Sequence, residues 1–513
     1  MGKLLEEYVD VLSKAGLIRM SSVCEEKQEI ENITYHSQRV VKNTIFICKG
    51  AGFKKEYLQE AARWGAVCYI SEKYYAGVHL PYILVSDIRE AMPLLAREFY
   101  DFDNISLRTI GITGTKGKTT TTYYVKAILD EYMVSLKKKK TAMISSIKTY
   151  DGVRFAESVM TTPEALEVYR YMHTAEENDI SHMTVEVSSQ ALKYNRVKGI
   201  SFDTGVFLNI SEDHISPVEH KDFDDYFHAK LSLFEQTGYA CVNVDSDYAD
   251  VILKEAGKCK NILTFGMKEG ADIRGSNVKV ENGKISFEVS CDRFWTKIQL
   301  AMDGLFNVEN ALAAICVAYR YHVPVRYIVK GLENTVVEGR MEKYRSRRNN
   351  ISVIVDYAHN YLSFKRLYES VRLEYPDSSI ISVFGCPGDK AYNRRRELGT
   401  IAGYFSDKVY LSTDDPGTES PEQMSKEIGQ YIEQSGVGYE FIENREMAIR
   451  TAIGKSKDNT VVLVLGKGNE KYQKCGQGLC FYQTDSVIVQ KCLQEMDSRY
   501  DNAGEAFLKD NWA

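Results

Sequence analysis

The sequence predicts an α/β protein of three domains, and two observations lead to this prediction. The chain has 513 residues, whereas a single domain typically has ~150. Short apolar runs of strand length alternate with longer segments in which apolar residues recur at helical spacing. We expect a small α/β N-terminal domain over residues 1–103, a central domain over 104–336 and a C-terminal domain over 337–513.

The composition excludes several classes of protein. Apolar residues make up 44% of the chain and charged residues 27%, which is ordinary for a globular protein with a sizeable core. A net charge of −6 does not indicate the basic surface that nucleic-acid-binding proteins typically have. The one basic cluster, Lys137–Lys140, is expected to be an exposed turn between a helix and a strand.

The cysteine pattern and the hydropathy indicate an intracellular location. The eleven cysteines include no Cys-x-x-Cys pair, and their odd number is typical of reduced thiols. The first 16 residues have the pattern of an amphipathic helix, not of a signal peptide, and no apolar run reaches the ~18 residues of a membrane span. We therefore expect a cytoplasmic protein that does not insert into a membrane.

A glycine-rich loop between Leu107 and Thr122 is the most informative segment of the chain. An apolar strand-like run ends at Gly114, and Gly117 is followed by Lys118 at the start of a predicted helix. A glycine loop at a helix N-terminus presents backbone N–H groups to phosphate, and the lysine adds a positive charge. A hydroxyl beside the lysine can bind magnesium. The loop therefore predicts a P-loop-type central ATPase domain.

The loop differs from the general P-loop pattern. That pattern places a glycine five residues before Gly117, where this chain has Ile112, and the nearest earlier glycine is Gly111. A purely structural strand–turn–helix is the alternative, but phosphate binding is the better interpretation.

Polar side chains follow the strands of the predicted central sheet. Glu186 ends one strand-like run, Asn209 follows the next, and His214 lies five residues further on. Ligands bind beyond the carboxyl ends of parallel strands, so these side chains are expected near the glycine loop. A carboxylate between valines is costly unless it is paired or binds a metal. Thr119 and Glu186 are therefore candidate ligands of one magnesium ion.

Three further residues allow two interpretations each. His214 is either a metal ligand or a cap of the next turn. Lys230 lies on an aromatic-rich helix and is, from the residues alone, a surface lysine whose stem packs on apolar neighbours. Asn307, at the start of a buried helix, either caps that helix or contacts a nucleotide base.

The C-terminal segment predicts a Rossmann-like, doubly wound sheet. Four strand-like runs, separated by helical patterns, cover residues 351–355, 379–384, 408–412 and 460–465. Their polar ends, among them Asp356, Asp414–Gly417 and Gly466–Glu470, would share one edge and form a binding face. Asp414–Gly417 is also a plausible β-turn by itself.

Together these motifs resemble those of the Mur ligases, and the resemblance extends over nearly the whole chain. It rests on six motifs: Thr113–Thr121, Thr161–Thr162–Pro163, Glu186–Ser189, Asn209–His214, Gly339–Glu342 and Asp356–His359. Within the family, the motifs are most similar to those of the enzymes that add the third amino acid, a diamino acid, to UDP-N-acetylmuramoyl-L-alanyl-D-glutamate. The resemblance implies ligation through an acyl phosphate, with ATP as a substrate, in the synthesis of peptidoglycan and hence of the cell wall.

The resemblance also implies a role for individual residues. Gly114–Thr120, that is Gly114, Thr115, Lys116, Gly117, Lys118, Thr119 and Thr120, would bind ATP together with Asn307, Arg340 and Asp356. The muramoyl-dipeptide substrate would contact Ser37, Thr161, Thr162, Ser188 and Arg196, and the diamino acid would contact Asp414, Asp415, Gly466 and Glu470.

Metal binding and catalysis are implied for a smaller set. Thr119, Glu186 and His214 would hold magnesium, and Lys230 would be an N6-carboxylysine that binds a second magnesium ion. This role replaces the surface-lysine interpretation. Lys118, Lys230 and His214 would be the catalytic residues.

Some positions depart from the family pattern. His36, Gln190 and Asn469 stand where other residues are usual. Enzymes that use meso-diaminopimelate carry Asp-Asn-Pro-Arg where this chain has Asp414–Gly417, and glycine cannot pair with the extra carboxylate. The sequence therefore favours L-lysine weakly, although Lys467 or Arg394–Arg396 could replace the arginine. A folylpolyglutamate or cyanophycin synthetase-like ligase, or a non-catalytic nucleotide-binding relative, remains the alternative.

Overall fold

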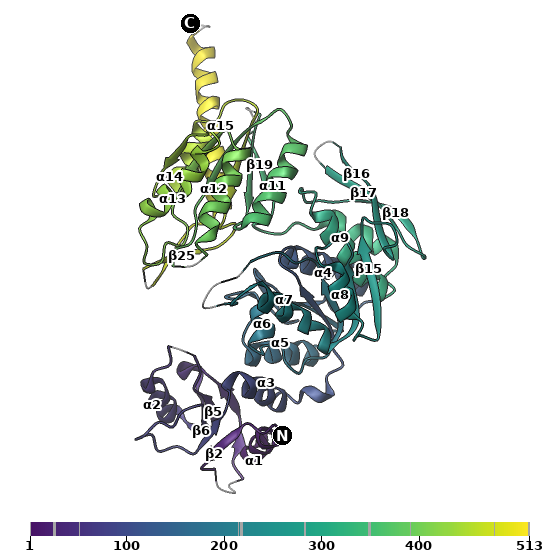
Figure 1. Cartoon of the computed structure of the whole chain (residues 1–513), viewed down its shortest axis with the longest axis vertical. Coiled ribbons are helices and arrows are strands. Elements are labelled where there is room, and N and C mark those ends of the chain that lie inside the picture. Colours follow the sequence, from purple (N-terminus) through teal and green to yellow (C-terminus); the bar gives the residue numbers. More distant parts are fainter. Residues whose placement is uncertain are drawn as a thin grey trace.

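The computed structural model describes residues 2–23, 27–50, 52–213, 215, 219–281, 284–346, 350–389, 391–476 and 478–510. These residues form three α/β domains arranged along the long axis of the molecule, with the central domain between the other two (Figure 1). The predicted fold class is confirmed. The boundaries near residues 103 and 336 stay predictions.

The N-terminal domain has a mostly parallel sheet in the order β2-β7-β6-β5-β4. Its strands are β2 (Ile18–Ser21), β4 (Asn32–Thr34), β5 (Thr44–Ile47), β6 (Ala66–Ser71) and β7 (Tyr82–Val85), beside a small pair of β1 (Lys3–Leu4) and β3 (Glu29–Ile30). Its helices are α1 (Leu5–Lys14), η1 (Ser37–Arg39), α2 (Lys55–Trp64), α3 (Ile88–Phe99) and η2 (Phe102–Asn104).

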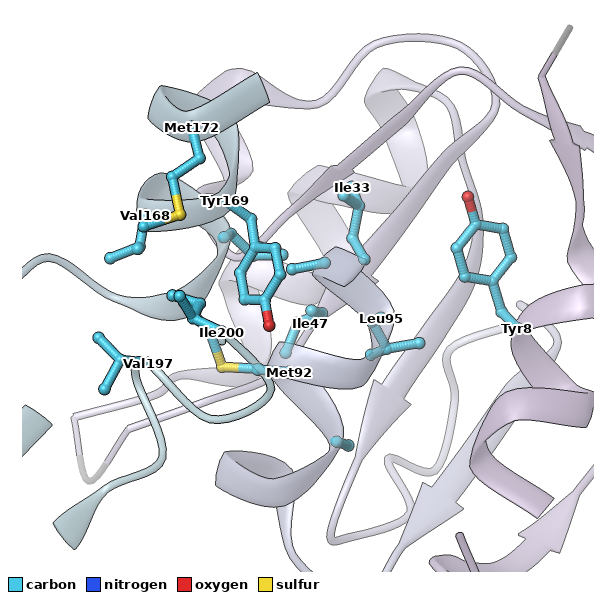
Figure 2. Close-up of a cluster of buried hydrophobic side chains, with 14 of the residues drawn as sticks. Tyr8, Ile33, Ile47, Met92, Leu95, Val168, Tyr169, Met172, Val197 and Ile200 are labelled. Carbon is cyan, nitrogen blue, oxygen red and sulfur yellow. The ribbon is translucent and has the colours of Figure 1, made fainter. Parts of the chain in front are cut away.

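A single apolar cluster joins the N-terminal domain to the central domain. Met92 and Leu95 of α3 pack in the same cluster as Val168 and Tyr169 of α5 (Ala165–Glu177) (Figure 2). Across the same boundary, the Tyr35 hydroxyl donates to Glu167 Oε2 at 2.7 Å. Because this core is continuous, burial of apolar surface holds the two domains together.

The central domain is built on eleven described strands in the order β11-β10-β9-β12-β8-β13-β14-β15-β16-β17-β18. The run from β9 to β16 is parallel, and the strands outside it pair antiparallel. The strands are β8 (Arg108–Thr113), β9 (Ala142–Ile144), β10 (Lys148–Tyr150), β11 (Phe155–Glu157), β12 (His182–Glu186), β13 (Phe202–Phe207), β14 (Thr237–Asn243), β15 (Asn261–Gly266), β16 (Ile273–Glu281), β17 (Lys284–Ser290) and β18 (Trp295–Gln299). The remaining helices are α4 (Lys118–Ser135), α6 (Ser189–Lys193), α7 (Phe223–Leu231), η3 (Ser232–Gln236), α8 (Ala249–Ala256), α9 (Asn307–Arg320) and α10 (Val325–Asn334).

The C-terminal domain is doubly wound, with the sheet order β19-β20-β24-β21-β22-β23. The strands are β19 (Glu342–Arg345), β20 (Ile351–Asp356), β21 (Ser379–Phe384), β22 (Lys408–Leu411), β23 (Tyr439–Phe441) and β24 (Thr460–Leu465), and a hairpin of β25 (Tyr472–Cys475) and β26 (Gly478–Phe481) follows. The helices are α11 (Tyr361–Glu374), α12 (Asn393–Phe405), α13 (Pro421–Glu433), α14 (Arg445–Gly454) and α15 (Asp485–Asp510).

Apolar side chains point alternately to the two faces of the sheet along β20, which explains why helices cover both faces. Ile354 packs in the cluster of α11, α12 and α13, whereas Val353 and Val355 pack in the cluster of α14 and α15. The edge strands β19 and β23 were not expected from the sequence, because Glu342–Arg345 and Tyr439–Phe441 are short and carry polar residues.

Two expectations about the surface are also tested. Lys137–Lys140 is exposed between α4 and β9, as predicted. No helix in the part of the chain that the structure describes has the length and apolar character needed to cross a membrane.

Candidate active site

The glycine loop connects β8, in the middle of the central sheet, to α4. Gly117 has φ +86°, a left-handed conformation, and a Cβ there would collide with the Asn310 side chain. Lys118 Nζ donates to the carbonyls of Gly114, at 2.9 Å, and Thr115, at 3.2 Å. Burial lowers the pKa of Lys118. The loop therefore concentrates N–H groups and one amine beside a helix N-terminus, which is a binding site for phosphate.

Glu186 lies beside this loop because β12 pairs with β8. Its Oε1 accepts from Ser146 N at 2.8 Å, and its Oε2 accepts from Ser146 Oγ at 3.0 Å and Thr119 Oγ1 at 3.1 Å. Burial raises the pKa of Glu186 above its usual range. Thr119 and Glu186, predicted to share a cation, are thus in direct contact.

The donor set for a metal is only partly within the described residues. No group of three or more His, Cys, Asp and Glu side chains able to hold a metal occurs among them. His214 lies outside the described residues, so its predicted roles stay predictions. The oxygen atoms of Thr119 and Glu186 are the ligand type that magnesium prefers, with phosphate oxygens supplying further positions.

Lys230 is 1% exposed, so the interpretation of a surface lysine is wrong. Tyr226 and Lys230 lie one turn apart on the inner face of α7. Lys230 Nζ donates to Gly114 O at 2.9 Å and lies 4.7 Å from the Tyr226 ring centroid. Burial and then the charge of Lys118 hold the pKa of Lys230 well below its usual value. The Lys230 amine therefore contacts the glycine loop, and its surroundings favour its neutral form.

The C-terminal domain contributes the opposite wall of a 220 Å³ cavity over the loop. Arg340 Nη2 donates to Thr119 Oγ1 at 3.5 Å, and its guanidinium lies 4.5 Å from the Tyr357 ring centroid. Asp356, at the end of β20, accepts from Met341 N at 2.8 Å and Ala358 N at 2.7 Å. Asp356 thus fixes the cavity wall through backbone contacts.

Asn307 and Asn310 have different positions relative to this cavity. Asn307 Nδ2 donates to Asp303 O at 2.6 Å, and its Oδ1 accepts from Asn310 Nδ2 at 2.9 Å. Asn310 lines the cavity, whereas Asn307 is buried behind it. Ser146 also lines the cavity and was missed, because an isolated serine carries no distinctive sequence pattern. Tyr357 and His359 line it too; they belong to the Asp356–His359 motif but were given no role of their own.

Four of the five residues expected to contact the muramoyl-dipeptide, all except Ser37, converge on the same strand end. Thr162 Oγ1 donates to Glu186 O at 2.7 Å and accepts from Ser188 N at 3.0 Å. Arg196 Nη1 donates to Thr162 O at 3.2 Å. Ser146 Oγ and Thr161 Oγ1 are 3.1 Å apart, so Thr161 also lies beside Glu186.

A larger cavity of 750 Å³ lies between the N-terminal and central domains. Lys49, Glu164 and Arg196 line it, and Glu164 accepts from Lys49 Nζ at 2.8 Å and lies 3.3 Å from Arg196 Nη2. Ser37, at the start of η1, is not among the described residues that line this cavity. The structure therefore brings Arg196 to the cavity but not Ser37.

The predicted amino-acid site is a compact ionic cluster at the carboxyl ends of β22 and β24. Lys467 Nζ is 2.8 Å from Glu470 Oε2, 2.9 Å from Asp415 Oδ1 and 3.6 Å from Asp414 Oδ1. Burial alone would lower the pKa of Lys467, but the three carboxylates together raise it. Gly466, with φ +113°, passes directly beside the Asp414 carboxylate.

Two of the three arginines considered as replacements for the missing one contact other carboxylates. Arg395 pairs with Glu419 at 2.8 Å and with Glu427 at 2.6 Å. Arg394 pairs with Asp213 at 3.0 Å. Three carboxylates around one lysine leave the predicted amino-acid site with an excess of negative charge.

Comparisons with known proteins agree on one family. The family model described as Mur ligase middle domain matches residues 112–318, and that described as Mur ligase, glutamate ligase domain, matches residues 339–468. The UDP-N-acetylmuramoyl-L-alanyl-D-glutamate–L-lysine ligase of Enterococcus faecalis is 38% identical over 87% of this chain and 88% of its own length. The UDP-N-acetylmuramyl-tripeptide synthetase of Lactobacillus acidophilus is 34% identical over 96% of this chain and 98% of its own length.

Solved structures show the same fold. A UDP-N-acetylmuramoyl-L-alanyl-D-glutamate–2,6-diaminopimelate ligase superposes with a TM-score of 0.64 at 24% identity, covering 97% of this chain and 99% of that chain. MurF from Acinetobacter baumannii superposes with a TM-score of 0.67 at 18% identity, covering 96% and 99%.

Proposed function

We propose that this chain, which belongs to the Mur ligase family of ATP-dependent ligases, adds a diamino acid to UDP-N-acetylmuramoyl-L-alanyl-D-glutamate. One observation carries the proposal. Glu186 contacts the ATP side of the site through its carboxylate, which accepts from Thr119, and the acceptor side through its carbonyl, which accepts from Thr162. Nucleotide and acceptor peptide would therefore meet at one residue.

The reaction needs positioning and charge stabilisation more than a protein nucleophile. The acceptor carboxylate attacks the γ-phosphate of ATP, which gives an acyl phosphate and ADP. The amine of the diamino acid then attacks the acyl carbon, and phosphate leaves. Lys118 and Arg340 would neutralise phosphate charge, while Thr162 and Arg196 would orient the acceptor.

Magnesium fits the oxygen donors that this chain presents. Thr119 and Glu186 would hold one ion, with His214 as a further proposed ligand, and a bound ion would neutralise phosphate charge. Ser146 orients the Glu186 carboxylate by donating from both its backbone and its hydroxyl. These two hydrogen bonds fix the orientation of the Glu186 carboxylate in which it would bind a cation.

Carbamylation of Lys230 is part of the proposal. The buried amine of Lys230 has a pKa well below its usual value, and a neutral amine adds carbon dioxide to give a carbamate and one proton. The product, N6-carboxylysine, carries a carboxylate that fits a second magnesium ion. Its position beside Gly114 would place that charge at the phosphate loop.

L-Lysine is the diamino acid that the site favours. Asp414, Asp415 and Glu470 offer carboxylates to an ammonium group, and Lys467, with the more distant charge of Lys474, offsets only part of their negative charge. Gly417 has φ +59°, and a Cβ there would displace the Asp389 carboxylate, which accepts from Thr418 N and Thr418 Oγ1. The left-handed backbone and this contact therefore disfavour, at position 417, the arginine that would recognise a second carboxylate. The relatives from Enterococcus faecalis and Streptococcus pneumoniae are named L-lysine ligases.

The test is ADP release by the full-length protein with UDP-N-acetylmuramoyl-L-alanyl-D-glutamate and L-lysine, meso-diaminopimelate or ornithine. We expect turnover to be highest with L-lysine. Turnover with meso-diaminopimelate alone would overturn the specificity. Turnover only with a folate or cyanophycin acceptor would replace the function by that of another ligase, and ATP binding without any turnover would indicate a non-catalytic relative.

A further inference from the structure

Ser189, His220 and Asp225 form a hydrogen-bonded triad beside the proposed active site. His220 Nε2 lies 3.0 Å from Ser189 Oγ, and His220 Nδ1 lies 3.0 Å from Asp225 Oδ2. An ionised carboxylate only accepts, so Nδ1 carries the proton and Nε2 accepts from the serine hydroxyl. This is the order of groups that activates a nucleophilic serine in hydrolases.

The triad is not placed for nucleophilic attack. Ser189 is 4% exposed and His220 0% exposed. Neither residue is among those that line the two cavities described above. Among the residues that the structure describes, the serine hydroxyl is therefore enclosed, and we interpret the three groups as acting through what they hold in place.

The triad connects two helices with different roles in the site. Ser189 begins α6, directly after Ser188, whose side chain caps the helix by accepting from Ala191 N at 3.1 Å. Asp225 lies in the first turn of α7 and also accepts from Lys193, the last residue of α6, at 2.5 Å. His220 thus connects the start of α6 to the start of α7 through its two hydrogen bonds.

Helix α7 leads from this contact to the glycine loop. Tyr226, the residue after Asp225, donates from its hydroxyl to Thr115 Oγ1 at 3.0 Å. One turn later, Lys230 Nζ donates to Gly114 O. The His220 ring packs edge-on against Tyr226, with ring centroids 5.2 Å apart. The rotation of α7 about its own axis therefore determines where the amine of Lys230 lies.

We propose that His220 is a positioning residue that couples the acceptor-binding start of α6 to the helix that carries Lys230. The inference rests on the proposed function in one respect, the carbamylation of Lys230. Acceptor contacts at Ser188 are transmitted through Ser189 and His220 to Asp225. The coupling holds the Lys230 amine at the glycine loop, where carbon dioxide adds to it and the resulting carboxylate is kept in place.

The test compares full-length variants by ¹³C NMR in labelled bicarbonate and by steady-state kinetics. Lys230→Ala identifies the carbamate signal. His220→Asn retains an amide donor towards Asp225 but is too short to reach Ser189. We expect His220→Asn to lose at least three-quarters of the carbamate signal and at least tenfold in kcat, with partial recovery as bicarbonate is raised. A merely structural role would not give recovery by bicarbonate.

Ser189→Ala is the milder second variant, since it removes one hydrogen bond and leaves the His220–Asp225 contact. We expect a several-fold increase in KM for the muramoyl-dipeptide substrate with a smaller loss of the carbamate signal. His228→Gln is the matched control, because His228 lies on the same helix but is exposed; its Nδ1 lies 2.8 Å from the Asp224 carbonyl and its ring lies beside that of Phe227.

The outcomes separate this inference from the proposed function. A normal carbamate signal and kcat in His220→Asn would overturn the inference while ligation stands. Equal losses in His228→Gln would also overturn it. If the wild-type protein ligates no diamino acid, the proposed function fails, whereas the dependence of the carbamate signal on His220 still supports or overturns the coupling.

Discussion

Arg394 of the C-terminal domain donates to Asp213 of the central domain at 3.0 Å. The Asp213 side chain is only 3% exposed, and Lys116 of the glycine loop lies 3.4 Å from its other oxygen. Asn360, the N-cap of α11, also donates to Asp213. One buried carboxylate thus joins the phosphate loop to two helices of the C-terminal domain, and it stabilises the arrangement in which that domain covers the cavity.

Replacing Arg394 by methionine is expected to lower kcat/KM for ATP by about 30-fold. Removal of one partner of a buried, hydrogen-bonded charge pair costs at least ~2 kcal/mol, which corresponds to that factor. The measurement is initial-rate kinetics with varied ATP. Lys471→Met is the control, since Lys471 pairs with Glu157 across the same two domains but both side chains are exposed. A similar loss in both variants would show that any interdomain ion pair has this effect.

The sequence predicted those features of the site that short segments determine. The glycine loop and the contact of Thr119 with Glu186 follow from a local pattern and from the rule that parallel strands end at one edge. Burial of Lys230 did not follow, because the same helix pattern suits an exposed lysine. Asp213 and Arg394 are 181 residues apart, and only the packing of two domains brings them together. Ser37 was predicted by resemblance, and whether it lines the large cavity depends on how two domains pack, which the sequence does not show.

Replacing Lys230 by alanine is expected to lower kcat by at least 100-fold, with partial recovery in formate or acetate. Loss of a group that stabilises charge in the transition state typically has an effect of this size. A small carboxylate can occupy the space of the missing carbamate. The measurement is ADP release with increasing formate, and the control is Lys221→Ala on an exposed side chain. Unchanged turnover in Lys230→Ala would exclude the proposed metal role.

Gly417 is expected to tolerate no side chain, which prevents a change of specificity by arginine alone. Gly417→Arg should lower turnover with L-lysine and give none with meso-diaminopimelate, because the side chain would collide with Asp389. A second measurement separates collision from backbone strain. Gly417→Ala should destabilise the protein in urea more than Gly436→Ala, since Gly436 has a similar φ of +76° but no neighbouring atom within 4 Å of a Cβ. Equal destabilisation, or efficient use of meso-diaminopimelate by Gly417→Arg, would contradict the steric argument.

His182 is expected to make folding sensitive to acid. Its ring is buried in the central domain, with Nδ1 2.9 Å from Ser181 Oγ and the ring edge-on to Tyr321. Burial, with the nearby charges of Arg108 and Lys138, lowers the pKa of His182 to about 4 in the folded protein. The unfolded chain has a histidine pKa of about 6.5, so it binds a proton between these values while the folded protein does not. Stability is therefore lost as the pH falls from 6.5 towards 4.

The size of this effect follows from the two pKa values. Between pH 7 and pH 5 the unfolding free energy should fall by about 2 kcal/mol through His182 alone. Other groups titrate in the same range, so the informative quantity is the difference between the wild type and His182→Gln in urea unfolding at pH 7, 6 and 5. We expect His182→Gln to be less stable at pH 7 and the difference to shrink by about 2 kcal/mol at pH 5. The same replacement of exposed His228 should leave the wild-type pH profile unchanged. A constant difference between wild type and His182→Gln would mean that the pKa of His182 is the same in the folded and the unfolded chain, which its burial beside Arg108 opposes.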